Sequence, residues 1–243
     1  MQNIDPIKYR PKHLTVDDIK SGCITLYGEN SEETKLCMMH EEFRQGIDVI
    51  RDFTPSVTFY GSTRLPPEHP DYIKAYQLAY RISKELGYNI LSGGGGGIME
   101  AVSQGGFDAS GKSVGLTIRL PREQMTNKYV THEIPFYFFF ARQVAMSYAT
   151  EVCIFCPGGF GTLDELFEMI TLQQTGKIGR IPVILFGSAF WNPLQKVIKE
   201  VLMDTYHTVD ISDVNLYIIT DDVDEILKII SESKLRDGQD ALA

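Results

Sequence analysis

The chain has 243 residues, of which 43% are hydrophobic, and this is enough for one large α/β domain with a core of its own. It carries 23 Lys and Arg residues against 32 Asp and Glu residues, a net charge of −9. This acidic balance argues against a nucleic-acid-binding protein, which needs a basic face. It still allows a small anionic ligand, because a glycine-rich loop can bind phosphate through backbone N–H groups whatever the global charge.

The sequence shows no targeting segment and no membrane span. Its first residues, "MQNIDPIKYRPKH", contain no apolar run, and no later apolar stretch is long enough to cross a bilayer. We therefore expect a soluble, cytoplasmic protein without a membrane partner.

The four cysteines, Cys23, Cys37, Cys153 and Cys156, do not indicate a disulfide framework. Cys153 and Cys156 have C-x-x-C spacing, but they fall in a predicted strand, where positions three apart point to opposite faces. We expect them to be small buried apolar residues rather than a redox or metal pair. The five histidines match no metal-ligand spacing, so no metal is expected.

The first fifty residues are expected to form an N-terminal extension. Residues 1–30 predict an irregular arm with one short strand at "CITLY". Residues 32–53 predict an amphipathic helix, because apolar residues recur there at intervals of three and four. These apolar positions are Leu36, Met39, Phe43, Ile47 and Ile50.

From residue 51 onward, strand patterns alternate with helical patterns. Strands are expected within residues 56–62, 88–92, 112–118, 152–156, 181–187 and 215–220. Helices are expected within residues 70–87, 98–107, 138–151, 161–176, 192–205 and 221–234, and residues 119–137 are expected to be a loop. This alternation predicts one doubly wound, Rossmann-like parallel sheet with helices on both faces. The catalytic domain would cover residues 51–236, followed by a frayed tail over 237–243.

Three predicted strands end in stretches with unusual residues: "YGSTR", "SGGGGGIME" and "PGGFGTLDE", of which the last two are rich in glycine. Ligands of open α/β sheets bind beyond the carboxyl ends of the strands, so these stretches should meet at one edge. Glycines without a Cβ, followed by a helix start, predict a cradle for a phosphate or a sugar. The alternative is a plain strand-to-helix turn. A dinucleotide site is weakly indicated, because no acid follows at the expected spacing.

Three polar residues near these stretches are candidates for chemistry. Thr162 could cap a helix or donate its hydroxyl to a phosphate. Glu165 could be an ordinary acid at a helix start, or it could hold a water or stabilise a cation. Arg142 lies on a mostly apolar helix, where it could extend to solvent or bind a carboxylate or phosphate.

Together these motifs resemble a known family. The pattern P-G-G-x-G-T-x-x-E is filled by Pro157, Gly158, Gly159, Gly161, Thr162 and Glu165. The pattern G-G-G-x-G-I-M-E-A is filled by Gly93, Gly94, Gly95, Gly97, Ile98, Met99, Glu100 and Ala101, and a G-S turn by Gly61 and Ser62. Over roughly residues 50–235 the chain thus resembles the LONELY GUY (LOG) phosphoribohydrolases, also described as possible lysine decarboxylases. It departs from them at Gln143, where the family usually has lysine after the arginine.

The resemblance implies hydrolysis of the N-glycosidic bond of a nucleoside 5′-monophosphate to a free base and ribose 5-phosphate. AMP or a cytokinin riboside 5′-monophosphate would be the substrate, with no cofactor or metal. Arg142 and Glu165 would be the catalytic pair. The two glycine stretches, Ser62 and Glu100 would contact the nucleotide.

Two further expectations concern alternatives and assembly. A non-catalytic nucleotide- or molybdenum-cofactor-binding protein of the same fold is the alternative function. A lysine decarboxylase would need a pyridoxal phosphate lysine, and no suitable lysine closely follows either glycine stretch.

The resemblance implies a homodimer or a larger homo-oligomer. The aromatic run over residues 136–140 fits either an interface or core packing.

Overall fold

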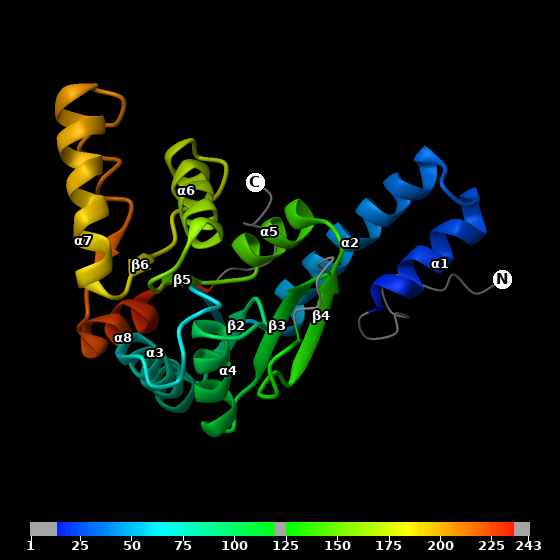
Figure 1. The fold of residues 1–243 in the computed structure, drawn as a ribbon, viewed down its shortest axis with the longest axis horizontal. Coiled ribbons are helices and arrows are strands. Elements are labelled where there is room, and N and C mark those ends of the chain that lie inside the picture. Colours follow the sequence, from blue (N-terminus) through cyan, green and yellow to red (C-terminus); the bar gives the residue numbers. More distant parts are fainter. Residues whose placement is uncertain (1–13, 120–124, 236–243) are drawn as a thin grey trace.

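The computed structural model describes residues 14–119 and 125–235, so the tail predicted over 237–243 lies outside the described residues. Within them, seven parallel strands form one sheet in the order β4-β3-β2-β1-β5-β6-β7 (Figure 1). The strands are β1 Ser56–Tyr60, β2 Asn89–Ser92, β3 Ser113–Ile118, β4 His132–Phe136, β5 Val152–Phe155, β6 Val183–Leu185 and β7 Ile218–Ile219. The strand order reverses between β1 and β5, which makes this a doubly wound fold, as predicted.

Helices cover both faces of the sheet and bury two separate apolar clusters. One cluster joins the sheet to α3 (Pro70–Arg81), α4 (Ile98–Asp108) and α8 (Val223–Glu232). The other joins it to α5 (Phe139–Tyr148), α6 (Phe160–Gln174) and α7 (Ser188–Val197). Helices α3 and α7 continue as π-helical segments over Ile82–Leu86 and Ile198–Thr205. Among the described residues, no helix combines the length and apolar character needed to cross a bilayer.

Cys153 and Cys156 confirm the period-two geometry expected of their strand. Both are fully buried. Cys153 belongs to the apolar cluster on one face of the sheet, and Cys156 belongs to the cluster on the other. They therefore lie on opposite sides of the sheet, as the spacing predicted.

The amino-terminal part differs from the prediction. The predicted strand at "CITLY" is wrong, because these residues end α1, a helix over Val16–Tyr27. A capping box starts that helix: the Thr15 hydroxyl accepts the N–H of Asp18, and the Asp18 carboxylate accepts the N–H of Thr15. The predicted domain boundary at residue 50 stays a prediction.

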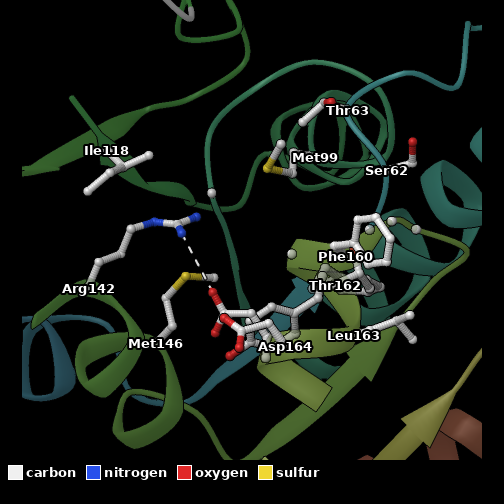
Figure 2. Close-up of a pocket in the computed structure, with 18 of the residues that line it drawn as sticks. Ser62, Thr63, Met99, Ile118, Arg142, Met146, Phe160, Thr162, Leu163 and Asp164 are labelled. Carbon is white, nitrogen blue, oxygen red and sulfur yellow. Dashed lines mark ion pairs between the residues drawn. The ribbon is translucent and has the colours of Figure 1, made fainter. Parts of the chain in front are cut away.

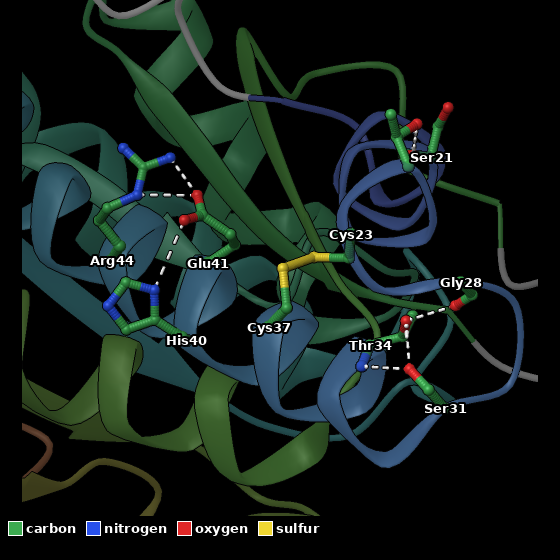
Figure 3. The surroundings of a disulfide bond; sticks show 10 residues. Ser21, Cys23, Gly28, Ser31, Thr34, Cys37, His40, Glu41 and Arg44 are labelled. Carbon is green, nitrogen blue, oxygen red and sulfur yellow. Dashed lines mark hydrogen bonds and ion pairs between the residues drawn. A yellow bond between two sulfur atoms is a disulfide. The ribbon is translucent and has the colours of Figure 1, made fainter.

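The expectation of no disulfide is also wrong. Cys23 on α1 is bonded to Cys37 on α2 (Glu32–Asp52), with their Cα atoms 5.8 Å apart (Figure 3). The two helices form an antiparallel hairpin whose small core also contains Ile19 and Met38. The pairing depends on Cys23 lying on a helix that packs against α2, which the strand predicted at "CITLY" does not provide.

Helix α2 confirms the predicted helix but not its buried face. Of the predicted apolar positions, Leu36 and Ile47 are 65% and 37% exposed, while Met39 and Phe43 are half-buried. The buried positions lie instead on a largely polar strip spaced by three and four residues. This strip consists of Thr34, Met38, Glu42, Gln45 and Gly46.

Strand β4 lies inside the predicted loop over residues 119–137. Among the described strands it pairs only with β3, so it forms an edge of the sheet. Pro135 has no N–H to donate, and this is tolerated on an edge strand. Pro135 disfavours a strand in the sequence, but the position of β4 at the edge of the sheet allows this segment to be one.

Candidate functional site

A cavity of about 760 Å³ opens at the carboxyl edge of the sheet, where the strand order reverses. The loop after β1 lines one part of it, and the loop between β5 and α6 lines another. In Figure 2, Arg142 and Met146 lie on one side, and Ser62, Thr63 and Phe160 lie on the other. This is the usual ligand position of a doubly wound sheet, and three neighbouring strands, β2, β1 and β5, bring the predicted motifs together there.

Ser62 forms backbone hydrogen bonds to both glycine-rich loops. Its backbone N–H donates to the Pro157 carbonyl at 3.0 Å, and its own carbonyl accepts the N–H of Ile98 at 2.9 Å. Ile98 is the first residue of α4, and Pro157 opens the loop before α6. The short turn after β1 therefore fixes the distance between both helix starts.

Packing explains several glycines of the "GGGGG" stretch. A Cβ on Gly97 would lie 2.2 Å from the Ser62 carbonyl oxygen, and one on Gly94 would lie 2.8 Å from the Thr117 side chain. Both residues also have positive φ angles. A Cβ on Gly93 would lie 2.4 Å from the Arg142 guanidinium. Gly94 and Gly97 are therefore needed whether or not a ligand binds, so the number of glycines alone is weaker support for a cradle than the sequence suggested.

In the "PGGFG" stretch, packing explains one of the three glycines and not the other two. Gly158 is required by packing, because a Cβ there would lie 2.0 Å from the Thr162 hydroxyl. A Cβ on Gly159 or Gly161 would meet nothing within 4 Å. Gly159 is the N-cap of α6 and provides no side-chain cap. The start of α6, with its positive dipole end, is therefore left open toward the cavity.

Arg142 and Glu165 form the buried ionic pair of the cavity. Nη1 of Arg142 lies 3.6 Å from Oε1 of Glu165, and the two side chains are only 12% and 10% exposed. The Arg142 Nε donates to the Leu116 carbonyl on β3 at 2.7 Å, which orients the guanidinium. The other carboxylate oxygen of Glu165 is buried and, within the described residues, has no hydrogen-bond partner. It can accept a bond from a water or a substrate hydroxyl.

Burial sets the protonation of this pair. It raises the pKa of Glu165 from 4.5 to about 7, against the opposing effect of Arg142, while the Glu168 and Asp164 carboxylates add to the increase. Burial also lowers the pKa of Arg142, which Glu165 counteracts. A carboxyl with a pKa near neutrality is suited to gain and lose a proton during a reaction.

The structure separates the predicted site residues into two groups. The first group lines the cavity: Gly61, Ser62, Gly93, Arg142, Gly158, Gly159, Gly161, Thr162 and Glu165. The second group supports the loops from outside that lining: Gly94, Gly95, Gly97, Glu100 and Pro157. Glu100 is half-buried in the first turn of α4, as an ordinary acid at a helix start would be.

Sequence reasoning missed other residues of the cavity. Arg64 is an exposed cation in its lining, only two positions beyond Ser62. The apolar lining includes Met99, Ile118, Phe139, Met146 and Phe160. Asn127 donates through its side chain to the carbonyls of Gly94 and Gly95, which anchors the glycine loop. Several of these residues had a signal in the sequence, including Arg64 in the "YGSTR" motif, Met99 in the "SGGGGGIME" motif and Phe139 in the aromatic run over residues 136–140.

Two observations concern pyridoxal phosphate and metal ions. Among its described lining residues there is no lysine that could hold pyridoxal phosphate. Within residues 14–119 and 125–235, no group of three or more His, Cys, Asp or Glu side chains is placed to hold a metal ion.

Two plant enzymes are among the curated proteins to which the chain is similar. The chain is 34% identical over 122 residues to a cytokinin riboside 5′-monophosphate phosphoribohydrolase of Oryza sativa subsp. japonica, covering 47% of this chain and 50% of the relative. It is 30% identical over 120 residues to an enzyme of the same name from Arabidopsis thaliana, covering 49% and 53%. The chain therefore spans about half the length of these relatives.

Among solved structures, the molybdenum cofactor binding protein from the phototrophic bacterium Rippkaea orientalis superposes with a TM-score of 0.53. The match covers 72% of this chain and 93% of that one, at 22% identity, so it shows the shared fold alone. The family described as "Possible lysine decarboxylase" matches residues 99–230, more than half of the chain. The chain belongs to this family, which includes the LOG phosphoribohydrolases.

Proposed function

We propose that the protein hydrolyses the N-glycosidic bond of a nucleoside 5′-monophosphate, of the AMP or cytokinin riboside 5′-monophosphate type. The products would be a free base and ribose 5-phosphate. The observation that carries the proposal is the buried pair of Arg142 and Glu165, placed in the same cavity as an uncovered helix start. The names of the plant relatives support the same reaction class.

The substrate phosphate would bind at the start of α6. Gly159 and Gly161 leave the backbone N–H groups there uncovered, and the helix dipole favours an anion. The hydroxyl of Thr162 could donate a further hydrogen bond. Arg64, exposed in the cavity lining, would add positive charge on the same side.

The ribose would then lie near Glu165. As the bond to the base breaks, positive charge develops on the sugar, and an ionised carboxylate beside it stabilises that charge. Glu165 would also orient the attacking water and accept its proton. The hydroxyl oxygen of that water becomes bonded to C1′ of the ribose, and its proton ends on the departing base. Arg142 would hold the carboxylate in place or contact the phosphate.

The test is to incubate the purified protein with AMP, GMP, CMP, UMP and isopentenyl-AMP and to assay ribose 5-phosphate. We expect release from at least one nucleotide and none from the corresponding nucleoside, which lacks the phosphate. Glu165→Gln should reduce the rate by about 100-fold or more. Gln174→Ala, at an exposed position near the end of α6 and outside the cavity lining, should retain hydrolysis.

A second candidate function is binding without catalysis, of a nucleotide or of molybdenum cofactor. Gln143 in place of the usual lysine favours it, as does the name of the Rippkaea orientalis protein with the same fold. Nucleotide binding by calorimetry, without any release of ribose 5-phosphate from the panel, would favour this candidate and contradict the hydrolase.

We also propose a homodimer or larger homo-oligomer in the cytoplasm, without a nucleic-acid or membrane partner. Within the aromatic run, Phe136 is buried in the core and Phe138 is half-buried. Tyr137, Phe139 and Phe140 are 51%, 55% and 43% exposed, which supports an interface near α5. Light scattering after size-exclusion chromatography measures the assembly directly.

A further inference from the structure

We propose that Glu42 on α2 is a positioning residue for Arg142, acting through the start of α5. This inference rests on the proposed function for its catalytic meaning. Glu42 is fully buried, and its two carboxylate oxygens accept the backbone N–H groups of Tyr137, at 2.8 Å, and Phe138, at 3.0 Å. Phe138 is the N-cap of α5 and provides no side-chain cap of its own. A carboxylate from a different helix therefore holds this helix start.

Two sets of contacts connect Glu42 to the site. The carbonyl of Phe138 accepts the N–H of Arg142 at 3.2 Å, within the first turn of α5. The Arg142 side chain then reaches the Leu116 carbonyl and the Glu165 carboxylate. Glu42 fixes the backbone from which the guanidinium extends, while β3 fixes its far end.

The surrounding face of α2 is built for this close contact. Gln45 donates to the Pro135 carbonyl at 3.4 Å, so α2 contacts the chain before α5 at an acceptor as well as at two donors. A Cβ on Gly46 would lie 2.8 Å from the Cβ of Ala145, so the helices meet closely at that point. In Figure 1, α2 runs beside α5 and β4. A helix that only covered the core would bury apolar side chains here instead.

The charge of Glu42 matters for this role. Burial raises the pKa of its carboxyl, and the two N–H groups of Phe138 and Tyr137 counteract that rise. An ionised carboxylate offers one oxygen to each N–H group, whereas a glutamine side chain offers one oxygen and one NH2 group, which only donates. Glu42→Gln therefore keeps the size of the side chain but leaves one backbone N–H facing another donor.

The first measurement is the pKa of Glu165 in the whole chain, by NMR of ¹³C-labelled glutamate carboxyls, assigned by the signal lost in Glu165→Gln. The groups facing this carboxyl are Arg142 from α5, Tyr60 from β1, and Asp164 and Glu168 from α6. If Glu42→Gln displaces the guanidinium, the pKa of Glu165 rises further above about 7. A cap that served stability alone would leave this pKa unchanged.

The second measurement is kinetics on a nucleotide that the parent hydrolyses. We expect Glu42→Gln to lower kcat about 10-fold or more, with a smaller change in KM, because the perturbed pair acts in the transition state. The acid limb of the pH–rate profile should move to higher pH together with the Glu165 pKa. Glu41→Gln is the matched control: Glu41 is the neighbouring residue but pairs with Arg44 and His40, and we expect parent values.

Gly46→Ala provides a second perturbation in case Glu42→Gln does not fold. It leaves every charge in place and forces α2 and α5 apart, so it should shift the Glu165 pKa and kcat in the same direction. Folded variants with the parent Glu165 pKa and the parent kcat would overturn the positioning role. If instead the parent hydrolyses no nucleotide but the variants shift the Glu165 pKa, the proposed function fails while the positioning role stands.

Discussion

Glu165 gives a prediction about stability that is independent of any substrate. Its carboxyl is 10% exposed and has a pKa of about 7 in the folded chain, against 4.5 ordinarily. Between these two values, the unfolded chain binds fewer protons at this group than the folded chain does. The free energy of unfolding must therefore fall as the pH rises from 4.5 through 7. Glu165→Gln removes this dependence, because an amide does not titrate.

The magnitude follows from the size of the pKa difference. Each pH unit corresponds to about 1.4 kcal/mol, so the full effect is about 3 kcal/mol, a large fraction of the stability of a typical domain. The isoelectric point near 5.1 makes solubility poor at the acid end. Between about pH 6 and about pH 8.5, roughly 1.4 kcal/mol of the effect remains to be measured.

The assay is urea unfolding of the parent and of Glu165→Gln at both pH values. We expect the stability of the variant relative to the parent to increase by about 1.4 kcal/mol between them. The loss of the Arg142 contact contributes to the absolute difference between the proteins, but only the titration contributes to its change with pH. Glu33→Gln, at an exposed position of α2, should show a nearly constant difference. A constant difference for Glu165→Gln as well would refute the argument from burial.

Two other predictions concern Gln143 and the disulfide. The Gln143 side chain donates to the Asp164 carboxylate at 2.8 Å, so Gln143→Lys would partly neutralise Asp164 and lower the pKa of Glu165. We expect faster nucleotide hydrolysis below pH 7, checked by pH–rate profiles; an equal or lower rate there would contradict this reasoning. Reducing the Cys23–Cys37 bond, which spans a sequence separation of 14, should lower the stability of the helical hairpin by about 3 kcal/mol, measured by urea unfolding with and without dithiothreitol.

The placement of the site was predictable because a parallel sheet puts the ends of all its strands on one edge. The sequence showed which strands end in glycine-rich stretches, and the fold made β2, β1 and β5 neighbours. The pairing of Arg142 with Glu165 was not predictable from periodicity, since they come from different helices with no fixed spacing. The prediction that Arg142 and Glu165 act as a pair came only from the family resemblance. The structure places the two groups 3.6 Å apart.

The two errors of secondary structure have a common physical cause. β-branched residues in "CITLY" favour a strand, and Pro135 disfavours one, but tertiary position decided both cases. Packing on α2 makes the first segment a helix, and the edge of the sheet accepts the proline in the second. Local preference is weakest where a segment is short and its conformation depends on the element against which it packs.

Helix α2 shows that the pattern of apolar residues can predict a helix without predicting which of its faces is buried. The pattern of apolar residues identifies a helix correctly, but it assumes that the buried face is the apolar one. Here Glu42 and Gln45 are buried while Leu36 is exposed, because the partner of α2 is a chain segment with backbone donors and an acceptor to satisfy. A buried acid is stable only opposite such groups, and these become visible only when the partner is placed. The predicted N-terminal extension thus contacts the element that carries Arg142, so deleting it would remove a support of the site as well as a surface helix.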